Sequence, residues 1–254
     1  MAHVDVCGRA LEYELIHAAD AAAPTVVFLH EGLGSLALWK DFPRQLAHAA
    51  GCNALVYSRH GYGNSAPLRE PRRPQFMHDE ALIALPELLD RLEVREPVLF
   101  GHSDGASIAL IHAGSAARPV RGAILLAPHV MVEEICVRSI AAAKRRYETT
   151  DWRERLRRFH ADPDGAFRGW CDVWLDPRFR DWNIEEHVGK VRCPLLAIQG
   201  YDDEYGTLEQ LRRIARLAPD AELLELQDCR HSPHRDQPAT VITAAVRFID
   251  RIRS

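Results

Sequence analysis

Short, continuous runs of apolar residues alternate along the chain with longer stretches in which apolar positions recur every three or four residues. The short runs are typical of strands buried on both faces, and the longer stretches are typical of helices with one apolar face. Strands are therefore predicted at 25–29, 54–57, 97–100, 122–127, 195–199 and 221–226. Helices are predicted at 41–50, 77–92, 208–217 and 239–252, with another directly after residue 103. This alternation predicts an α/β fold with a mostly parallel, doubly wound sheet and helices on both faces.

Two segments depart from this alternation. Residues 4–16 alternate between apolar and polar positions around a turn at 7–10, which predicts a pair of antiparallel edge strands. Residues 130–192 contain no strand-like run and are rich in Arg, Glu and Asp at helical spacing. We interpret this second segment as a helical cap over the carboxyl edge of the sheet, on a core formed by residues 1–129 and 193–254.

The predicted cap holds four of the five tryptophans of the chain, Trp152, Trp170, Trp174 and Trp182. These side chains can form a small core of the cap itself, or some of them can line a pocket for an acyl or aromatic substrate. We retain Trp170 and Trp174 as candidates for the second role.

Chain length, net charge and the spacing of the cysteines limit the kinds of protein that this sequence can encode. The 254 residues suffice for one large domain or two small ones, and the net charge of −4 gives no sign of nucleic-acid binding. No apolar run reaches transmembrane length, the first residues do not predict a secretory leader, and the six cysteines are scattered without a metal-binding or disulfide spacing. We expect a cytoplasmic protein with reduced thiols that acts on a small molecule without a metal, a cofactor, a nucleic acid or a membrane. The oligomeric state is not predicted.

The chemistry centres on Gly101-His102-Ser103-Asp104-Gly105, which joins a predicted strand to a predicted helix. Side chains at the two flanking positions of such a tight turn would collide, which explains the glycines, and the turn presents the central serine at the top of the sheet. Glycine and serine are also common in ordinary turns. The motif alone therefore leaves a catalytic serine and a plain strand-to-helix turn both open.

This motif resembles the nucleophile elbow of the α/β-hydrolase fold, and the resemblance extends over essentially the whole chain. That family places a serine, an acid and a histidine in this order, each after a strand. Gly200-Tyr201-Asp202-Asp203 resembles the family's Gly-x-x-Asp, which favours Asp203 as the acid over Asp202.

The resemblance also indicates the base. The stretch 228–234 resembles the family's Gly-His loop and places His231 in the catalytic position, with Arg230 where glycine is usual. His234 is then expected to be structural. The implied catalytic residues are Ser103, Asp203 and His231.

The oxyanion hole and the pocket follow from the same resemblance. Residues 30–35 resemble the family's His-Gly-x-x-x-Ser loop, with Glu31 where glycine is usual. The backbone N–H groups of Gly32 and Asp104 are the implied oxyanion donors, with Leu33 as the alternative to Gly32. Leu33 and His129 are also expected to line the substrate pocket. Residues 59–65 resemble a turn that is structural in most family members, and no chemistry is expected of them.

A serine nucleophile restricts the reaction. Dehalogenases and epoxide hydrolases of this fold need a carboxylate at the elbow, so Ser103 favours attack on an activated carbonyl. We expect a serine hydrolase of the carboxylic-ester type that cleaves an ester, thioester or lactone through an acyl-enzyme. The alternatives are hydrolysis of C–C bonds in ring-cleavage products, a perhydrolase or haloperoxidase-like activity, and a non-catalytic protein of this fold that binds a small ligand.

Overall fold

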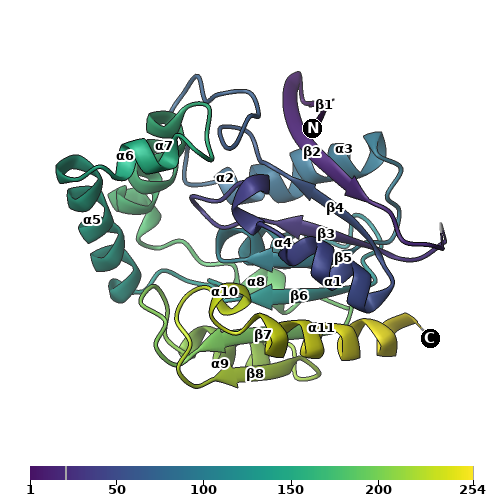
Figure 1. The fold of residues 1–254 in the computed structure, drawn as a ribbon. Coiled ribbons are helices and arrows are strands. Elements are labelled where there is room, and N and C mark those ends of the chain that lie inside the picture. The colour runs from purple at the N-terminus through teal and green to yellow at the C-terminus, as the bar shows by residue number, and fades with distance from the viewer. Residues whose placement is uncertain (21, 254) are drawn as a thin grey trace.

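The computed structural model describes residues 1–20 and 22–253, and it is built around one eight-stranded sheet (Figure 1). The strand order is β1-β2-β4-β3-β5-β6-β7-β8. The first two strands pair antiparallel, β2 also runs antiparallel to β4, and every further pair is parallel. The strands are β1 Ala2–Val6, β2 Arg9–Ile16, β3 Thr25–Leu29, β4 Asn53–Tyr57, β5 Val98–His102, β6 Gly122–Leu126, β7 Leu195–Gly200 and β8 Glu222–Leu226. The predicted mostly parallel α/β sheet is confirmed.

Helices cover both faces of the sheet. One face carries α1 Phe42–Ala50 and α11 Pro238–Arg253, which contact each other. The other carries α2 Phe76–Asp79, α3 Leu85–Arg91, α4 Asp104–Gly114, α8 Glu185–Val188 and α9 Glu209–Leu217. Alternate residues of a strand pack against opposite helical layers. Val98 and Phe100 pack with α1 and α11, whereas Leu99 packs with the layer on the other face. This double burial explains why the central strands are continuously apolar.

The segment between β6 and β7 is helical, as its spacing predicts. It contains α5 Glu134–Thr149, α6 Trp152–Leu156, α7 Pro163–Leu175, the 3-10 turn Pro177–Phe179 and α8. Figure 1 shows α5, α6 and α7 together beyond one end of the sheet, and these three helices contact one another. In contrast, α8 packs on α4 and α9 within a layer of the sheet. The division into core and cap at residues 130 and 192 stays a prediction.

The predicted helix at 77–92 is less regular than its spacing suggests. The helix α2 continues into a π-helical turn, Glu80–Ala84, and then into α3. Pro86 lies in the first turn of α3. Because proline has no N–H and its ring crowds the carbonyl four residues earlier, a widened turn at this point relieves the clash. No helix among the described residues combines the length and the apolar character needed to cross a membrane.

Candidate active site

Ser103 occupies a strained turn between β5 and α4. Its backbone has φ 53° and ψ −119°, a conformation that non-glycine residues rarely adopt. The neighbouring glycines permit it, because a Cβ on Gly105 would lie 2.0 Å from the carbonyl oxygen of Leu29 on β3. A Cβ on Gly101 would lie 2.4 Å from the carbonyl oxygen of Gly105. Both glycines therefore lie so close to backbone atoms that a side chain at either position would collide, as the sequence predicts.

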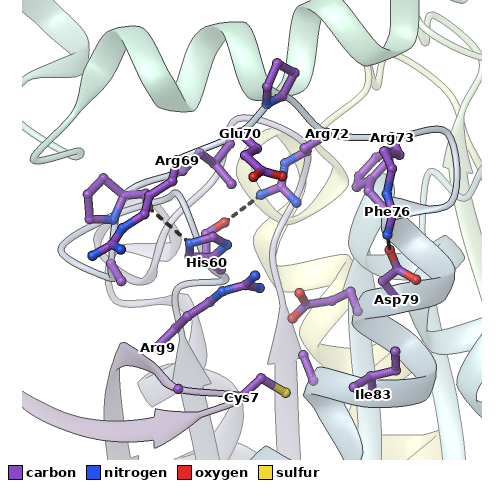
Figure 2. A pocket seen from close by; sticks show the side chains of 17 residues that line it. Cys7, Arg9, His60, Arg69, Glu70, Arg72, Arg73, Phe76, Asp79 and Ile83 are labelled. Carbon is purple, nitrogen blue, oxygen red and sulfur yellow. Dashed lines mark hydrogen bonds and ion pairs between the residues drawn. The ribbon is translucent and has the colours of Figure 1, made fainter.

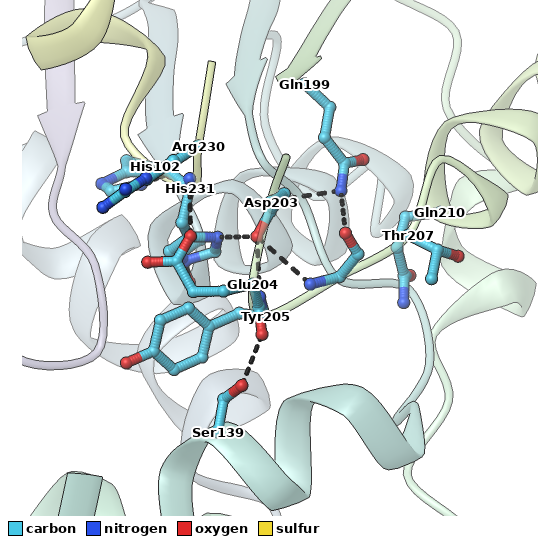
Figure 3. Close-up of polar contacts among 12 residues, drawn as sticks. His102, Ser139, Gln199, Asp203, Glu204, Tyr205, Thr207, Gln210, Arg230 and His231 are labelled. Atoms are coloured by element: carbon cyan, nitrogen blue, oxygen red, sulfur yellow. Dashed lines mark hydrogen bonds and ion pairs between the residues drawn. The ribbon is translucent and has the colours of Figure 1, made fainter. Parts of the chain in front are cut away.

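The structure brings Ser103, His231 and Asp203 together at the carboxyl edge of the sheet. His231 Nε2 lies 2.9 Å from Ser103 Oγ. His231 Nδ1 lies 2.8 Å from Asp203 Oδ1 (Figure 3). An ionised carboxylate can only accept, so His231 Nδ1 carries the proton and donates it to Asp203. Nε2 is then free to accept the hydroxyl proton of Ser103.

Asp203, and not Asp202, is the aspartate that contacts His231. The Asp203 carboxylate is buried and accepts hydrogen bonds from the backbone N–H groups of Tyr205 and Gly206 and from the side-chain amide of Gln199 (Figure 3). Burial alone raises the pKa of Asp203, but the charge and hydrogen bond of His231, together with the backbone hydrogen bond from Tyr205, lower it to about 2. Asp202 is exposed. Asp203 therefore stays ionised at neutral pH and orients the imidazole.

Carboxylates around His231 strengthen its basicity. Burial lowers the pKa of His231, but the charge and hydrogen bond of Asp203, together with the charges of Glu204 and Glu31, outweigh this effect. The pKa of His231 is consequently raised above its ordinary value of 6.5. Glu204 also accepts the backbone N–H of His231 at 3.3 Å.

A buried arginine holds the loop that is predicted to form part of the oxyanion hole. Arg59 donates from Nη2 to the carbonyl oxygens of His30 (3.2 Å) and Glu31 (2.9 Å), and its own backbone N–H donates to His30 Nε2. Sequence reasoning expected no chemistry of residues 59–65 and missed this contact. The complete burial of the Arg59 charge, which marks this contact as unusual, is visible only in the structure.

Glu31, which replaces the usual glycine of the loop, links two parts of the site. Its carboxylate accepts from Arg235 Nη2 at 3.0 Å and lies 3.5 Å from His102 Nδ1. His102 Nε2 in turn donates to the backbone carbonyl of His231 at 2.7 Å. Glu31, where the family motif usually has glycine, thus connects the predicted oxyanion loop to the loop that carries His231.

Ser103 opens into a cavity of about 240 Å³. The predicted pocket residues Leu33, His129, Trp170 and Trp174 all line it, as do the predicted oxyanion residues Gly32 and Asp104. Most of the remaining lining is apolar or aromatic, and apart from Trp152 it was not considered in the sequence analysis. These further residues are Leu38, Cys136, Ile140, Trp152, Leu156 and Tyr205.

Trp170 explains why position 32 is a glycine. A Cβ at this position would lie 2.2 Å from Trp170 Cδ1, so the indole fills the space that a side chain would need. A residue of α7 is therefore packed directly on the loop predicted to hold the oxyanion. The predicted helical segment contributes to the site as well as to its own packing.

A larger hollow of about 840 Å³ lies elsewhere on the surface (Figure 2). Arg9, His60 and Arg72 are among its lining residues, and His60 Nε2 donates to the carbonyl of Pro67. Ser103 and its two partners do not line it. The smaller cavity beside Ser103 is therefore the candidate active site.

The fold, the elbow and the hydrogen-bonded serine, histidine and aspartate define a protein of the α/β-hydrolase class. The chain belongs to the alpha/beta hydrolase family, whose model matches residues 26–245.

Named relatives and solved structures are distant in sequence. The chain is 22% identical to the sn-1-specific diacylglycerol lipase ABHD11 of Danio rerio, over 94% of this chain and 82% of that protein. An enol-lactonase from Burkholderia xenovorans LB400 has a TM-score of 0.78 at 20% identity, covering 98% of this chain and 100% of the other. A thermophilic esterase from Thermogutta terrifontis has a TM-score of 0.77 at 18% identity, with both chains fully covered. At these identities the structural likeness establishes the fold.

Proposed function

We propose that this chain is a serine hydrolase that cleaves a small-molecule ester, thioester or lactone through an acyl-enzyme. The observation that carries the proposal is the continuous hydrogen-bonded chain from Ser103 through His231 to Asp203, at the wall of a largely apolar cavity. An ester hydrolase needs a nucleophile, a base and an orienting acid in this arrangement. The names of the relatives, which include a lipase, a lactonase and an esterase, support the same reaction class.

The proposed reaction begins when His231 Nε2 accepts the proton of Ser103 as Oγ attacks the substrate carbonyl. The negative charge on the carbonyl oxygen is stabilised by the backbone N–H groups of Gly32 and Asp104. His231 then returns the proton to the leaving alcohol, thiol or, in a lactone, the ring oxygen. Water activated by His231 hydrolyses the acyl-enzyme and regenerates Ser103.

The size of the cavity predicts a preference for small acyl groups. Its volume of about 240 Å³ is below the roughly 300–1,000 Å³ typical of pockets for drug-sized ligands. In a series of p-nitrophenyl esters from acetate to decanoate, we expect the highest kcat/KM at hexanoate or shorter. Decanoate is expected to be at least about tenfold poorer, because its chain cannot be fully buried. A maximum at decanoate would contradict this pocket assignment, and no hydrolysis of any member would favour a C–C bond hydrolase or a ligand-binding protein.

The raised pKa of His231 predicts the pH dependence of ester hydrolysis. Only neutral His231 can accept the Ser103 proton, so kcat/KM should rise with pH as this residue loses its proton. Because the pKa of His231 is raised, the midpoint of the rising limb is expected above 6.5 and not below it. The check is a profile of kcat/KM from pH 5 to 9 with p-nitrophenyl acetate, corrected for spontaneous hydrolysis. A midpoint below 6.5 would contradict the assigned electrostatics.

A further inference from the structure

The peptide unit between Glu31 and Gly32 has the predicted oxyanion donor, the N–H of Gly32, on one side and the carbonyl of Glu31 on the other. This peptide bond is trans, as are all peptide bonds among the described residues. In a planar trans peptide the N–H and the C=O point in opposite directions. The direction of the Glu31 carbonyl therefore fixes the direction of the Gly32 N–H. Gly32 lines the cavity beside Ser103, whereas Arg59, which contacts the carbonyl, does not.

Three donors hold the Glu31 carbonyl oxygen in place. Arg59 Nη2 donates to it at 2.9 Å, His30 Nδ1 at 2.7 Å and the backbone N–H of Gly34 at 3.0 Å. The backbone N–H of Arg59 donates to His30 Nε2 at 3.0 Å, so the imidazole proton lies on Nδ1. Burial and the charge of Arg59 lower the pKa of His30 well below its ordinary value, which keeps the ring neutral. Arg59 therefore acts on this carbonyl directly, through its guanidinium, and indirectly, through His30.

Arg59 also compensates a charge beside the other predicted donor, the backbone N–H of Asp104. Its Nη2 atom lies 4.0 Å from Asp104 Oδ2, and the two side chains are 0% and 1% exposed. A buried carboxylate directly after Ser103 would oppose the negative charge that develops on the substrate oxygen. The guanidinium offsets that carboxylate. Arg59 thus interacts with both segments that carry the predicted oxyanion donors.

We propose that Arg59 is a positioning residue of the oxyanion hole, which holds the Gly32 N–H toward the substrate carbonyl oxygen. Arg59 itself does not touch the substrate. A cation that is hydrogen-bonded to a peptide carbonyl also polarises the peptide, so the N–H of the same unit becomes a stronger donor. The benefit is largest when the substrate oxygen is negative, so Arg59 acts on kcat more than on KM. This inference rests on the proposed acyl transfer to Ser103.

Arg59→Met and Arg59→Lys test the proposal, with Arg72→Met as the matched control. The Cζ atoms of Arg59 and Arg72 both lie 4.9 Å from the centre of the Tyr62 ring. Arg72 Nη2 also donates to a backbone carbonyl, that of His60 at 2.6 Å (Figure 2). This carbonyl does not belong to the peptide of the predicted donor. Arg72→Met therefore removes a similar side chain without releasing the Glu31 carbonyl.

Two measurements separate a positioning role from a loss of folded protein. The first is kcat and KM for the best p-nitrophenyl ester, with active sites counted by fluorophosphonate labelling of Ser103. The second is the Ki of an alkyl trifluoromethyl ketone. Ser103 Oγ adds to the ketone carbon, its proton passes to His231, and the carbonyl oxygen becomes an oxyanion. Because Ki is an affinity, it does not depend on the fraction of protein that is folded.

Arg59→Met is expected to lower kcat by about 10²-fold, as when one oxyanion donor is removed, with KM within about threefold of the wild type. The Ki of the ketone should rise by about the same factor as kcat falls. Arg59→Lys keeps the charge but lacks the planar fork of donors, so its kcat and Ki are expected between those of Arg59→Met and the wild type. Arg72→Met should keep both within about threefold.

The outcomes distinguish this inference from the proposed function. A folded Arg59→Met protein with wild-type kcat and Ki would overturn the inference, as would a loss of kcat without a rise in Ki, or an equal loss in Arg72→Met. If Arg59→Met does not fold, Arg59→Lys decides: a Ki raised by about fivefold or more supports the inference, and an unchanged Ki overturns it. All these results leave the serine hydrolase standing. If the wild type neither hydrolyses an ester through Ser103 nor binds the ketone, the proposed function fails as well.

Discussion

Replacing Ser103 with alanine is expected to lower kcat for p-nitrophenyl ester hydrolysis by at least about 10⁴-fold. The substitution removes Oγ, which lies 2.9 Å from His231 Nε2, and with it the proposed acyl-enzyme route. Any remaining turnover would come from water acting in a site that still holds the oxyanion donors. The measurement is the steady-state rate of wild type and Ser103→Ala side by side on the best ester of the series.

A matched control for Ser103→Ala is Ser139→Ala. Ser139 is partly buried, and its hydroxyl donates to the backbone carbonyl of Glu204 and not to Ser103, His231 or Asp203. We expect this variant to keep kcat within about threefold of the wild type, because it removes one hydrogen bond and none of the reacting groups. Most of the activity surviving in Ser103→Ala would contradict the nucleophile assignment.

The second large effect is expected from replacing Asp203, and the adjacent Asp202 provides the matched control. Asp203→Asn is expected to lower kcat/KM by about 10²- to 10⁴-fold, because a neutral amide cannot supply the negative charge that stabilises the His231 imidazolium formed during the reaction. The change keeps the shape of a side chain that is buried and held by three donors. Asp202→Asn, at an exposed position one residue earlier, should change kcat/KM by less than about threefold.

The pair of variants also distinguishes catalysis from stability. Both proteins should be compared for thermal unfolding, because loss of a buried carboxylate can destabilise the fold. A folded Asp203→Asn protein with nearly normal kcat/KM would contradict the assignment, and so would a larger loss in Asp202→Asn.

The features that could be predicted from the sequence are those with a local pattern. The continuous apolar runs that become β3 to β7 identify strands because helices bury both of their faces. The elbow around Ser103 could also be predicted, as could the positions of Asp203 and His231 after strands β7 and β8. The loops that follow parallel strands lie at one edge of the sheet. The order of these residues along the chain therefore predicts their meeting in space.

The features that escaped prediction depend on contacts between distant segments. Arg59 belongs to a turn with no expected chemistry, yet its guanidinium reaches the backbone of the loop that contains Glu31 and approaches Asp104. The tight packing of Trp170 on Gly32 joins two segments whose sequences give no sign of each other. Such contacts are fixed by how α7 and the loop after β3 meet, and a single sequence carries no periodic signal for them.

Trapping the acyl-enzyme is the sharpest test of Ser103 as the nucleophile. Wild-type protein is mixed with excess p-nitrophenyl ester, quenched in acid within the first turnovers, digested and analysed by peptide mass spectrometry. We expect a mass increase equal to the acyl group on the peptide that contains Ser103, and no such increase in Ser103→Ala. Ester turnover without an adduct, or with the acyl group on Cys136 in the same cavity, would contradict the proposed mechanism.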